Sequence, residues 1–363
     1  MEKILEREEV RGRIRRDAIS FWLSWGMVIV LPLILVPILA DAGILNPYYN
    51  DVLIRIVIWV MLSAGYNLIN GFSGQFSIGH CGFMAIGAYV AALLTTGGNP
   101  GYAGVTLRDP PLLGLLQNVN LSVMGYTFPL DFLPATLLGG IAAALVAFLI
   151  GIPAFRARGD YLCVITLAFN MIIVNIFQNL EYVGGSRGQP GIKHYTTFAW
   201  AWLWMIVCIV VIRNLILSAH GRAIMAVRDN EVAAELGGVD TLKYKLVALA
   251  IGAFFAGVAG ALLGHHMMFI NPNLFTIFRS FDVLIVMYLG GEGSITGSIV
   301  GAVIWILLIE VLRNPMTAIG IPEWRLVIGP LLLIVLMIMR PRGLLGGVEL
   351  PFIIRRERKG GER

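Results

Sequence analysis

The stretch IVIWVMLSAGYNLINGFSGQFSIGHCGFMAIGAYVAALLTTGGNPGYAGVTL (Ile56–Leu107) decides the fold class, because its 52 consecutive residues include no Asp, Glu, Lys or Arg. A transmembrane helix needs about 20 apolar residues to cross about 30 Å of hydrocarbon. Of the 363 residues 58% are hydrophobic and 13% are charged, about half of the roughly 25% charged residues in soluble domains. This composition excludes soluble, disordered and disulfide-stapled proteins.

A transmembrane β-barrel would show segments of about ten residues in which apolar and polar residues alternate. The apolar runs here are continuous, so the sequence predicts an all-α polytopic membrane protein with about 8–10 transmembrane helices, including discontinuous or re-entrant segments. The candidate spans are Phe21–Ala40, Val52–Asn70, Phe76–Thr96, Phe132–Ile152, Tyr161–Leu180, Phe198–Leu217, Lys245–Gly264, the composite region Phe281–Leu312, and Trp324–Met339. The first could also be a secretory signal, but its length exceeds the usual 7–15 apolar residues of a signal core, which favours an uncleaved span.

The basic residues predict the orientation, because Lys and Arg concentrate in cytoplasmic loops. Four basic segments should therefore be cytoplasmic: Arg11–Arg16, Arg156 with Arg158, Arg213–Lys245, and Arg340–Arg358. All four lie on one side only if the region 281–312 enters and leaves the membrane on the same side. Glycines at 290, 291 and 293 divide this region, which predicts a short re-entrant helix over 281–289 and a longer helix over 296–312. Both termini are then cytoplasmic.

Two glycine-rich interruptions, Gly71–His80 and Gly290–Gly297, fall inside the apolar regions. Non-helical backbone at membrane depth is tolerated only where protein buries it or where it lines a cavity. In transporters such breaks often lie beside the substrate site. The alternative is that the glycines only allow close packing of helices.

One connecting loop, Ser218–Lys245, is long and charged. Local signals predict one short helix from Gly221 through Val227, and a second that Asp229 or Asn230 caps and the glycines at 237 and 238 end. The second helix has apolar residues on one side and glutamates on the other, which suits docking to a partner protein. A solvated connector is the alternative.

The sequence of this loop, Glu231–Gly238, is similar to the cytoplasmic "EAA" loop of bacterial ABC-importer permeases, and the chain as a whole resembles the M-type permease subunit family of branched-chain amino acid ABC importers. The stretches that carry the resemblance are Gly65–Leu68, Gly74–His80, Gly159–Leu162, Thr166–Phe169, Gly221–Gly237, Ala256–Leu262, Gly290–Ser294 and Arg340–Leu344. Two outer loops, Gly97–Asp131 and Gly184–Ile192, are longer than the family pattern, and the role of the first is open. The resemblance implies a basic N-terminus (1–20), a transmembrane permease domain (21–340) containing the coupling loop (218–245), and a basic C-terminal tail (341–363).

The resemblance also implies the partners. A second, homologous permease subunit would pair with this chain, although a second copy of it is an alternative. Two cytoplasmic ABC ATPase subunits would bind ATP and Mg, and a periplasmic or lipid-anchored solute-binding protein would deliver the substrate. The chain itself would be a non-catalytic subunit in the bacterial inner membrane, without a cofactor or nucleic acid; it has no phosphate-binding Gly-x-x-x-x-Gly-Lys-[Ser/Thr] motif. The residues expected to couple the chain to the ATPases are Arg222, Arg228, Glu231, Ala234, Glu235 and Gly237.

A zwitterionic aliphatic amino acid needs hydrogen-bond donors, acceptors and an apolar wall, and the helix ends at the two breaks could supply the donors. The substrate-path candidates are Asn67, Ser73, Gln75, Ser77, His80, Ser294 and Thr296, followed by Asn170, Asn175 and Gln178. For each of them an interhelical hydrogen bond is the alternative role. A metal site is not expected, because the adjacent His265 and His266 do not share a helix face.

Three other functions stay open at this point. A permease of the same architecture could import urea, short amides or other amino acids. An ion-coupled carrier would need a carboxylate in mid-membrane, and the charge-free runs argue against it. A passive channel is the third alternative; Asn-Pro occurs at 46–47, 99–100, 271–272 and 314–315, but at predicted span edges, where this pair marks turns.

Overall fold

A computed structural model describes residues 31–39, 46–96, 120–123, 126–129, 131–156, 161–318, 325–340, 343–347 and 349. The chain forms two units, one of residues 1–50 with 350–363 and the other of residues 51–349. In the first unit the structure describes a helix over residues 31–39 and the first residues of α2. The second unit contains every contact discussed below.

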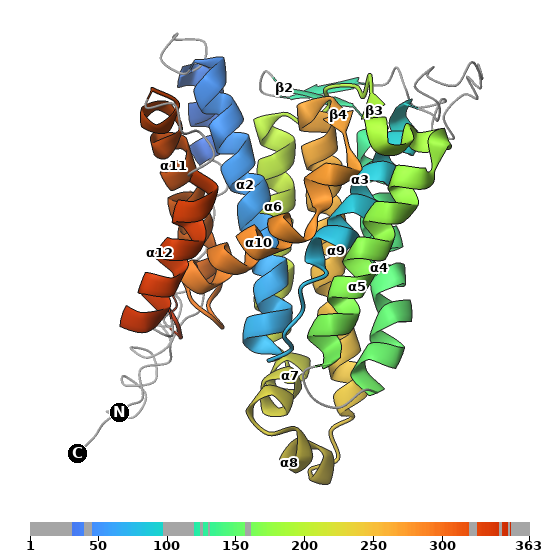
Figure 1. Ribbon diagram of the computed structural model, residues 1–363, viewed down its shortest axis with the longest axis vertical. Coiled ribbons are helices and arrows are strands. Elements are labelled where there is room, and N and C mark those ends of the chain that lie inside the picture. Colours follow the sequence, from blue (N-terminus) through green and yellow to red (C-terminus); the bar gives the residue numbers. More distant parts are fainter. Residues whose placement is uncertain are drawn as a thin grey trace, which may run out of the picture. The chain divides into compact units, whose positions relative to one another are not determined.

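The described part of the chain is almost entirely helical (Figure 1). The helices are α2 (Pro47–Asn67), α3 (His80–Thr96), α4 (Phe132–Arg156), α5 (Tyr161–Asn179), α6 (Phe198–Leu217), α7 (Ala219–Asp229), α8 (Glu231–Leu236), α9 (Thr241–Met267), α10 (Ile277–Gly290), α11 (Ile295–Ala318) and α12 (Arg325–Met339). The strands form two antiparallel pairs, β1 (Asn120–Val123) with β2 (Tyr126–Pro129), and β3 (Gln189–Pro190) with β4 (Phe269–Ile270).

Seven helical segments within the described ranges are long and apolar enough to cross a membrane. They are Pro47–Phe72, Phe132–Arg156, Leu162–Asn179, Phe198–Leu217, Thr241–Met267, Pro272–Gly290 and Ile295–Arg313. The apolar helix α3 has 17 residues and is shorter than these spans. The structure therefore confirms the prediction of an all-α polytopic membrane protein.

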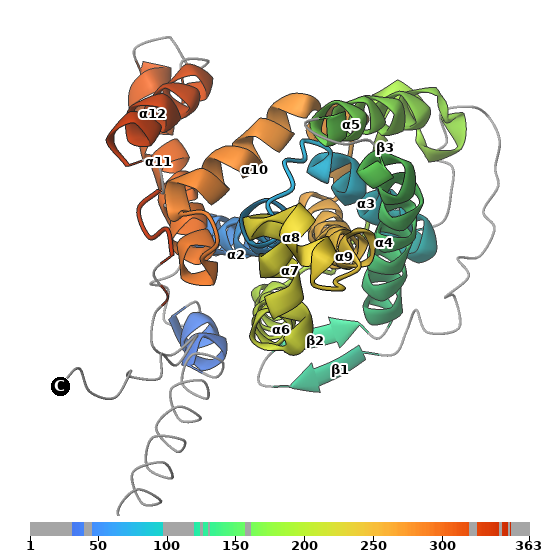
Figure 2. The same ribbon diagram turned by 90° about the horizontal axis from the view of Figure 1, so that it is seen from below.

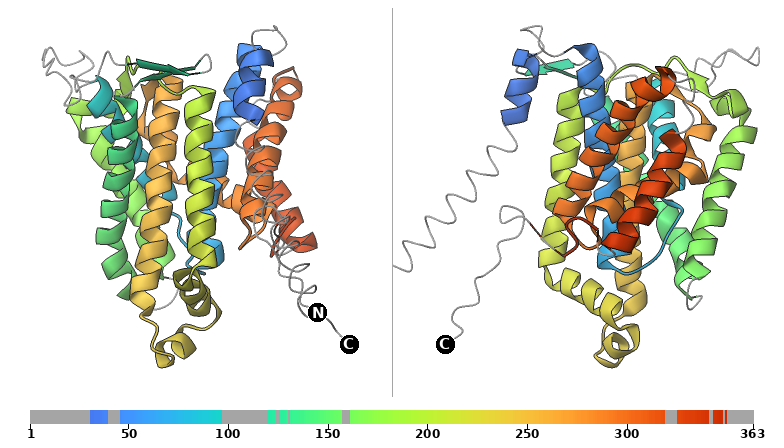
Figure 3. Two further views of the ribbon diagram at one scale, coloured as in Figure 1. Left: turned by 180° about the vertical axis from the view of Figure 1, so that it is seen from behind. Right: turned by 60° about the vertical axis from the view of Figure 1, so that its left-hand side comes forward.

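Glycines bring α3, α4 and α9 into close contact. A Cβ atom at Gly260 would lie 1.9 Å from the backbone oxygen of Met84, and one at Gly87 would lie 2.1 Å from that of Gly257. Lipid is as apolar as the side chains, so helices in a membrane associate largely through close packing of small residues. Figure 3 shows α4 and α9 side by side. Helix α4 also carries exposed apolar residues such as Leu145 and Leu149.

The helix boundaries differ from the sequence predictions mainly at the breaks. The third span begins at His80 and not at Phe76, because residues 74–79 are not helical and the N–H groups of Ser77 and Ile78 bond to side chains elsewhere. The composite region is divided at the predicted glycines, because α10 ends at Gly290 and α11 begins at Ile295. Its first part is longer than the predicted re-entrant helix over 281–289, since the segment Pro272–Gly290 is long and apolar enough to cross a membrane. In Figure 1 α10 crosses obliquely toward the end of α2 that lies near α7, and α11 and α12 run in opposite directions.

Candidate functional site

The first break follows α2 and consists of a π-helical turn, Leu68–Phe72, and residues 73–79, which belong to no helix or strand. Side chains from the end of α2 satisfy its backbone. Asn70 Oδ1 accepts a hydrogen bond from the Ser77 backbone N–H at 3.2 Å, and the Tyr66 hydroxyl donates to the Ser77 carbonyl at 2.5 Å. These bonds replace helical ones, so non-helical backbone is tolerated inside an apolar protein.

The second break, residues 291–294, separates α10 from α11. Gly291 and Gly293 have φ values of 130° and 68°, which glycine adopts without steric cost. The Ser294 hydroxyl accepts a hydrogen bond from the Gly297 N–H at 2.9 Å and so caps the first turn of α11.

Asn67, at the end of α2, joins the two breaks directly. Its Nδ2 donates to the Ser294 carbonyl and to the Ser298 hydroxyl, both at 2.8 Å, and its Oδ1 accepts from the Gly293 N–H at 2.9 Å. The Asn67 side chain is buried, with 1% relative exposure of the residue. A Cβ atom at Gly71 would lie 1.9 Å from Asn67 Oδ1 and 2.5 Å from the Gly293 nitrogen. The two segments, here called the paired breaks, therefore form one contact unit.

Three fully buried polar side chains near the paired breaks have no hydrogen-bond partner among the described residues: the Ser77 hydroxyl, both ring nitrogens of His80, and the Asn170 amide group. An unsatisfied buried polar group costs about 1–3 kcal/mol. The rings of Tyr66 and Phe83 lie edge-on to His80, with centroid distances of 5.1 and 6.2 Å. Unbonded side-chain donors and acceptors therefore lie beside aromatic rings in this part of the protein.

The other path candidates are engaged within the protein. Asn67 and Ser294 hold the paired breaks, as described above. The Ser73 carbonyl accepts from the half-buried Gln75 side chain at 3.3 Å, and the Thr296 hydroxyl donates to Glu349 at 2.6 Å. Of the second group of candidates, Asn175 is exposed and Gln178 bonds to Asn273 at 3.0 Å. Their assignment to the substrate path stays a prediction. Of all the candidates, Ser77, His80 and Asn170 have side-chain polar atoms without a hydrogen-bond partner among the residues that the structure describes.

Helices α7 and α8 form a loop beyond the ends of α6 and α9, as Figures 1 and 2 show. Ser218 caps α7, since its hydroxyl accepts from the Gly221 N–H at 3.2 Å, so this helix begins two residues before the predicted Gly221. Asn230 caps α8 by accepting from the Ala233 N–H at 3.0 Å, as one of the two predicted alternatives. Near Gly221, the Arg222 guanidinium donates to the Leu217 carbonyl at 3.4 Å.

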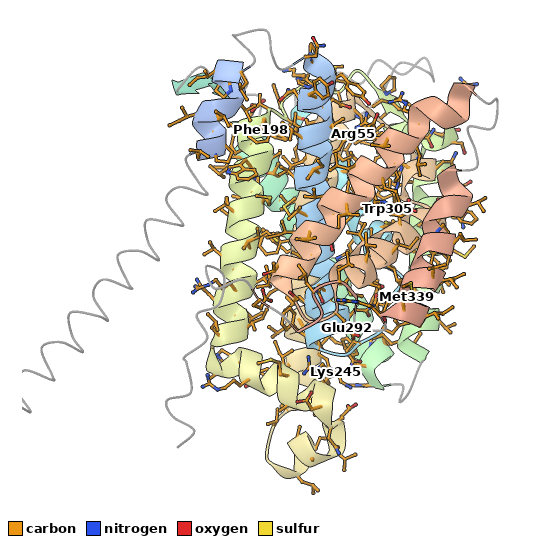
Figure 4. All side chains as sticks on the ribbon, turned by 90° about the vertical axis from the view of Figure 1, so that its left-hand side faces the viewer. Arg55, Phe198, Lys245, Glu292, Trp305 and Met339 are labelled. Carbon is orange, nitrogen blue, oxygen red and sulfur yellow. The ribbon has the colours of Figure 1, made fainter. Side chains whose placement is uncertain are left out.

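Arg228, near the end of α7, connects this loop to the paired breaks. Its Nη1 donates to the Gly71 carbonyl at 3.3 Å, and a Cβ atom at Gly74 would lie 2.7 Å from its Cγ. The same Nη1 would lie 3.5 Å from a Cβ atom at Gly293. Burial raises the pKa of Glu292 in the second break, and the positive charge of Arg228 opposes that rise. Figure 4 shows Glu292 and Lys245 toward the α7–α8 end of the unit, and Arg55 and Phe198 toward the other end.

The two glutamates of α8 attach this helix to α9. Glu231 forms an ion pair with Lys245 at 2.6 Å, and the Lys245 side chain is only 7% exposed. Glu235 accepts a hydrogen bond from the Thr241 hydroxyl at 3.0 Å. A coupling role for both glutamates stays a prediction; in the structure both are exposed and bonded within the chain. Ala234 is buried.

The outer surface of α8 is apolar. Val232 and Leu236 are 66% and 86% exposed. A hollow of about 450 Å³ lies at the C-terminal end of α8, lined by Glu235 and residues 238–242. Gly237 ends α8 and the following Gly238 has a φ of 81°, which turns the chain into this hollow. Exposed large apolar residues beside a hollow on a surface loop are typical of a protein–protein contact.

No group of three or more His, Cys, Asp or Glu side chains is placed to hold a metal ion in the residues that the structure describes. The adjacent His265 and His266 point to different partners. His265 lies between the Thr95 hydroxyl and the Ala261 carbonyl, each at 2.8 Å, and His266 bonds to Asp51 at 2.5 Å.

Comparison with known proteins identifies the family. The model of a family described as the permease component of branched-chain amino acid transport systems matches residues 48–337, a range that includes both breaks and the α7–α8 loop. The chain belongs to this family. The permease is therefore a multi-pass protein of the inner membrane, as its seven apolar helical segments also indicate.

Three relatives show how far the similarity extends. The permease is 29% identical over 330 residues to the high-affinity branched-chain amino acid transport system permease protein LivM of Salmonella typhimurium, covering 81% of this chain and 69% of the relative. The LivM protein of Escherichia coli K12 gives the same values. The LivH permease protein of that strain is 26% identical over 300 residues, covering 80% of this chain and 92% of the relative. No solved structure matches the permease.

Proposed function

We propose that the permease is the membrane-spanning subunit of an ATP-driven importer and forms the translocation path for branched-chain amino acids. Its family membership over residues 48–337 and the transport systems named for its relatives support this function. The observation that carries the mechanism is the bond from Arg228 to Gly71, because it attaches a partner-binding loop to the paired breaks.

The proposed importer has four further components. A second, related permease completes the path, and the relatives include two kinds of permease protein, LivM and LivH. Two ATPase subunits on the cytoplasmic side bind ATP and Mg, since this chain has no phosphate-binding loop. A solute-binding protein delivers the amino acid on the other side. The permease itself is a non-catalytic subunit, with both termini in the cytoplasm.

The α7–α8 loop is the coupling element in this proposal. Val232 and Leu236 insert into an apolar groove of an ATPase subunit, and the hollow at the C-terminal end of α8 receives part of that subunit. Glu231 and Glu235 hold α8 rigidly on α9 and so prevent it from moving alone. Closure of the ATPases then displaces α7, and Arg228 transmits this displacement to the first break.

The paired breaks respond as one unit, because Asn67 bonds the end of α2 to the start of α11. A rigid link between two discontinuous helices is how a displacement at one end of a transporter opens and closes a central site. In this proposal a movement of the first break alters the position of α11 and thereby the path beside α3 and α5.

The proposed substrate contacts are Ser77, His80 and Asn170, whose side-chain polar atoms have no partner within the described ranges, and the aromatic rings near them supply the apolar wall. The rings of Phe83 and Phe169 lie 5.0 Å apart between α3 and α5. A zwitterion with an aliphatic side chain uses both kinds of surface, since its charged groups need hydrogen bonds and its side chain needs apolar contact.

Uptake into proteoliposomes that contain the permease, its partner permease and the ATPases tests this proposal. With ATP at the ATPase side and solute-binding protein on the other side, labelled leucine accumulates, and unlabelled isoleucine and valine compete with it. Uptake that is independent of ATP, or driven by an ion gradient, contradicts an ATP-driven importer. Accumulation of urea or a short amide in place of leucine assigns the substrate to the alternative class.

A further inference from the structure

The chain that follows α12 returns to the second break and covers it. The Leu344 N–H donates to the Leu289 carbonyl at 3.1 Å, and the Leu345 N–H donates to the Gly290 carbonyl at 2.8 Å. These carbonyls belong to the last residues of α10, which have no partner inside their own helix. Residues 343–347 therefore complete the hydrogen bonding at the end of α10.

Glu349 completes the other side of the second break. Its Oε1 accepts from the Ile295 N–H at 2.6 Å, and its Oε2 accepts from the Thr296 N–H at 3.1 Å and from the Thr296 hydroxyl at 2.6 Å. The first N–H groups of a helix attract negative charge, and hydrogen bonds to a carboxylate are about twice as strong as neutral ones. One side chain thus holds the start of α11.

The fit between this segment and the break depends on glycine. A Cβ atom at Gly291 would lie 2.4 Å from the Gly346 nitrogen, and one at Gly343 would lie 2.3 Å from the Tyr288 carbonyl oxygen. Both residues also have positive φ values, of 130° and 75°. Gly343 belongs to the sequence stretch Arg340–Leu344, which the proposed function leaves without a role.

We propose that residues 343–347 together with Glu349 are a latch that holds the second break while the ATPases are empty and that releases Glu349 when ATP binding moves the α7–α8 loop. This inference rests on the proposed function. Asn67 holds the same break through a buried amide, whereas the Glu349 side chain that holds it is in a half-buried residue, so we assign the release to Glu349.

The latch contact is the one built to release. Leu344 is 36% exposed and Leu345 is half-buried, so hydrogen bonds and not apolar burial attach the segment. Segments with few buried apolar contacts open at low free-energy cost. Release frees the start of α11, and water hydrates the Glu349 carboxylate.

Hydrogen exchange in the assembled importer tests the release. In the nucleotide-free complex the Ile295 and Thr296 amides are protected, and in the vanadate-trapped complex their exchange is faster by on the order of ten-fold. The variant Glu349→Ala exchanges fast in both states. Equal protection in the two states of the wild type overturns the proposal, because Glu349 is then a fixed cap.

Basal ATP hydrolysis, measured without solute-binding protein, tests the function of the latch. Glu349→Ala raises it several-fold, because a break that is not held at rest rearranges without a signal from outside. Glu349→Gln removes the charge and Thr296→Val removes one hydrogen bond, so each variant raises basal ATP hydrolysis less than Glu349→Ala does. These two variants test the latch if Glu349→Ala fails to assemble. The control Glu310→Gln, on the same helix, behaves like the wild type. Basal hydrolysis that is unchanged in all the latch variants overturns the proposal. If the wild type does not import leucine, the proposed function fails. The hydrogen-exchange experiment still decides whether Glu349 releases, because its result does not depend on the substrate.

Discussion

Replacement of Asn67 by Ala is the most informative perturbation of the fold, since one small side chain holds two segments that lie 227 residues apart in the sequence. The substitution removes the donor to the Ser294 carbonyl and to the Ser298 hydroxyl, and it removes the acceptor of the Gly293 N–H. Ser298 still bonds to the Ser294 carbonyl through its own N–H at 3.1 Å, so that carbonyl keeps one partner. The Gly293 N–H keeps none of its present partners.

The expected cost follows from these contacts. The half-buried Gly293 N–H loses its acceptor at a cost of up to about 3 kcal/mol, and the two lost hydrogen bonds contribute about 1 kcal/mol each. Asn67→Ala therefore destabilises the permease by about 3–5 kcal/mol and lowers its melting temperature in detergent by on the order of 5–10 °C. Asn67→Asp is expected to be no better, because a carboxylate would face the Ser294 carbonyl oxygen without a proton to donate.

Thermal unfolding of the purified permease in one detergent provides the assay. The matched control is Asn179→Ala, whose exposed amide bonds only to the Asn175 carbonyl of its own helix at 2.8 Å. Its effect should stay within about 0.5 kcal/mol. If Asn67→Ala and Asn179→Ala unfold at the same temperature, Asn67 does not hold the breaks together and the paired-break account is refuted.

Further substitutions test other contacts. Leu236→Asp, at an 86% exposed position, should leave the melting temperature unchanged and abolish co-purification of the ATPases; retention of the ATPases would exclude α8 as the docking surface. Glu231→Gln should destabilise by about 1–3 kcal/mol, because it leaves the buried Lys245 without its carboxylate, and calorimetry that shows no difference from wild type would contradict this. Gly71→Ala should separate the paired breaks, since its Cβ would lie 1.9 Å from Asn67 Oδ1, and cost about 1–3 kcal/mol; unaltered thermal stability would argue against such tight contact.

The sequence alone could predict the spans where hydrophobicity decides both ends. Helix α6 begins at Phe198 and ends at Leu217, as expected from the apolar run. The break between α10 and α11 was also predictable, because it follows from glycines and from the positions of basic residues. The start of α3 was not, because the non-helical residues before it depend on distant side chains such as Thr166, which accepts from the Ile78 N–H at 3.1 Å. The β1–β2 hairpin, within a stretch expected only to be a long outer loop, was missed as well.

The candidate site was predictable as a set of residues but not as a set of contacts. Both breaks carry visible glycine signals, yet nothing in one sequence shows that Asn67 bonds to Ser294. Glu349 gave no signal at all, because one of three glutamates in a basic tail looks like a solvated residue. The two glutamates of α8 were visible, but their partners Thr241 and Lys245 lie on the next helix and depend on how the loop folds.

The central claim is that the α7–α8 loop drives the paired breaks through Arg228. The most direct test is the ratio of leucine imported to ATP hydrolysed, measured in the variant Arg228→Ala. In proteoliposomes with all partner subunits, this variant is predicted to hydrolyse ATP and to import at least about ten-fold less leucine per ATP, the equivalent of losing roughly one hydrogen bond to a charged donor. The control Lys243→Ala, an exposed basic residue at the start of α9, should keep the wild-type ratio. A wild-type ratio in Arg228→Ala would contradict the account.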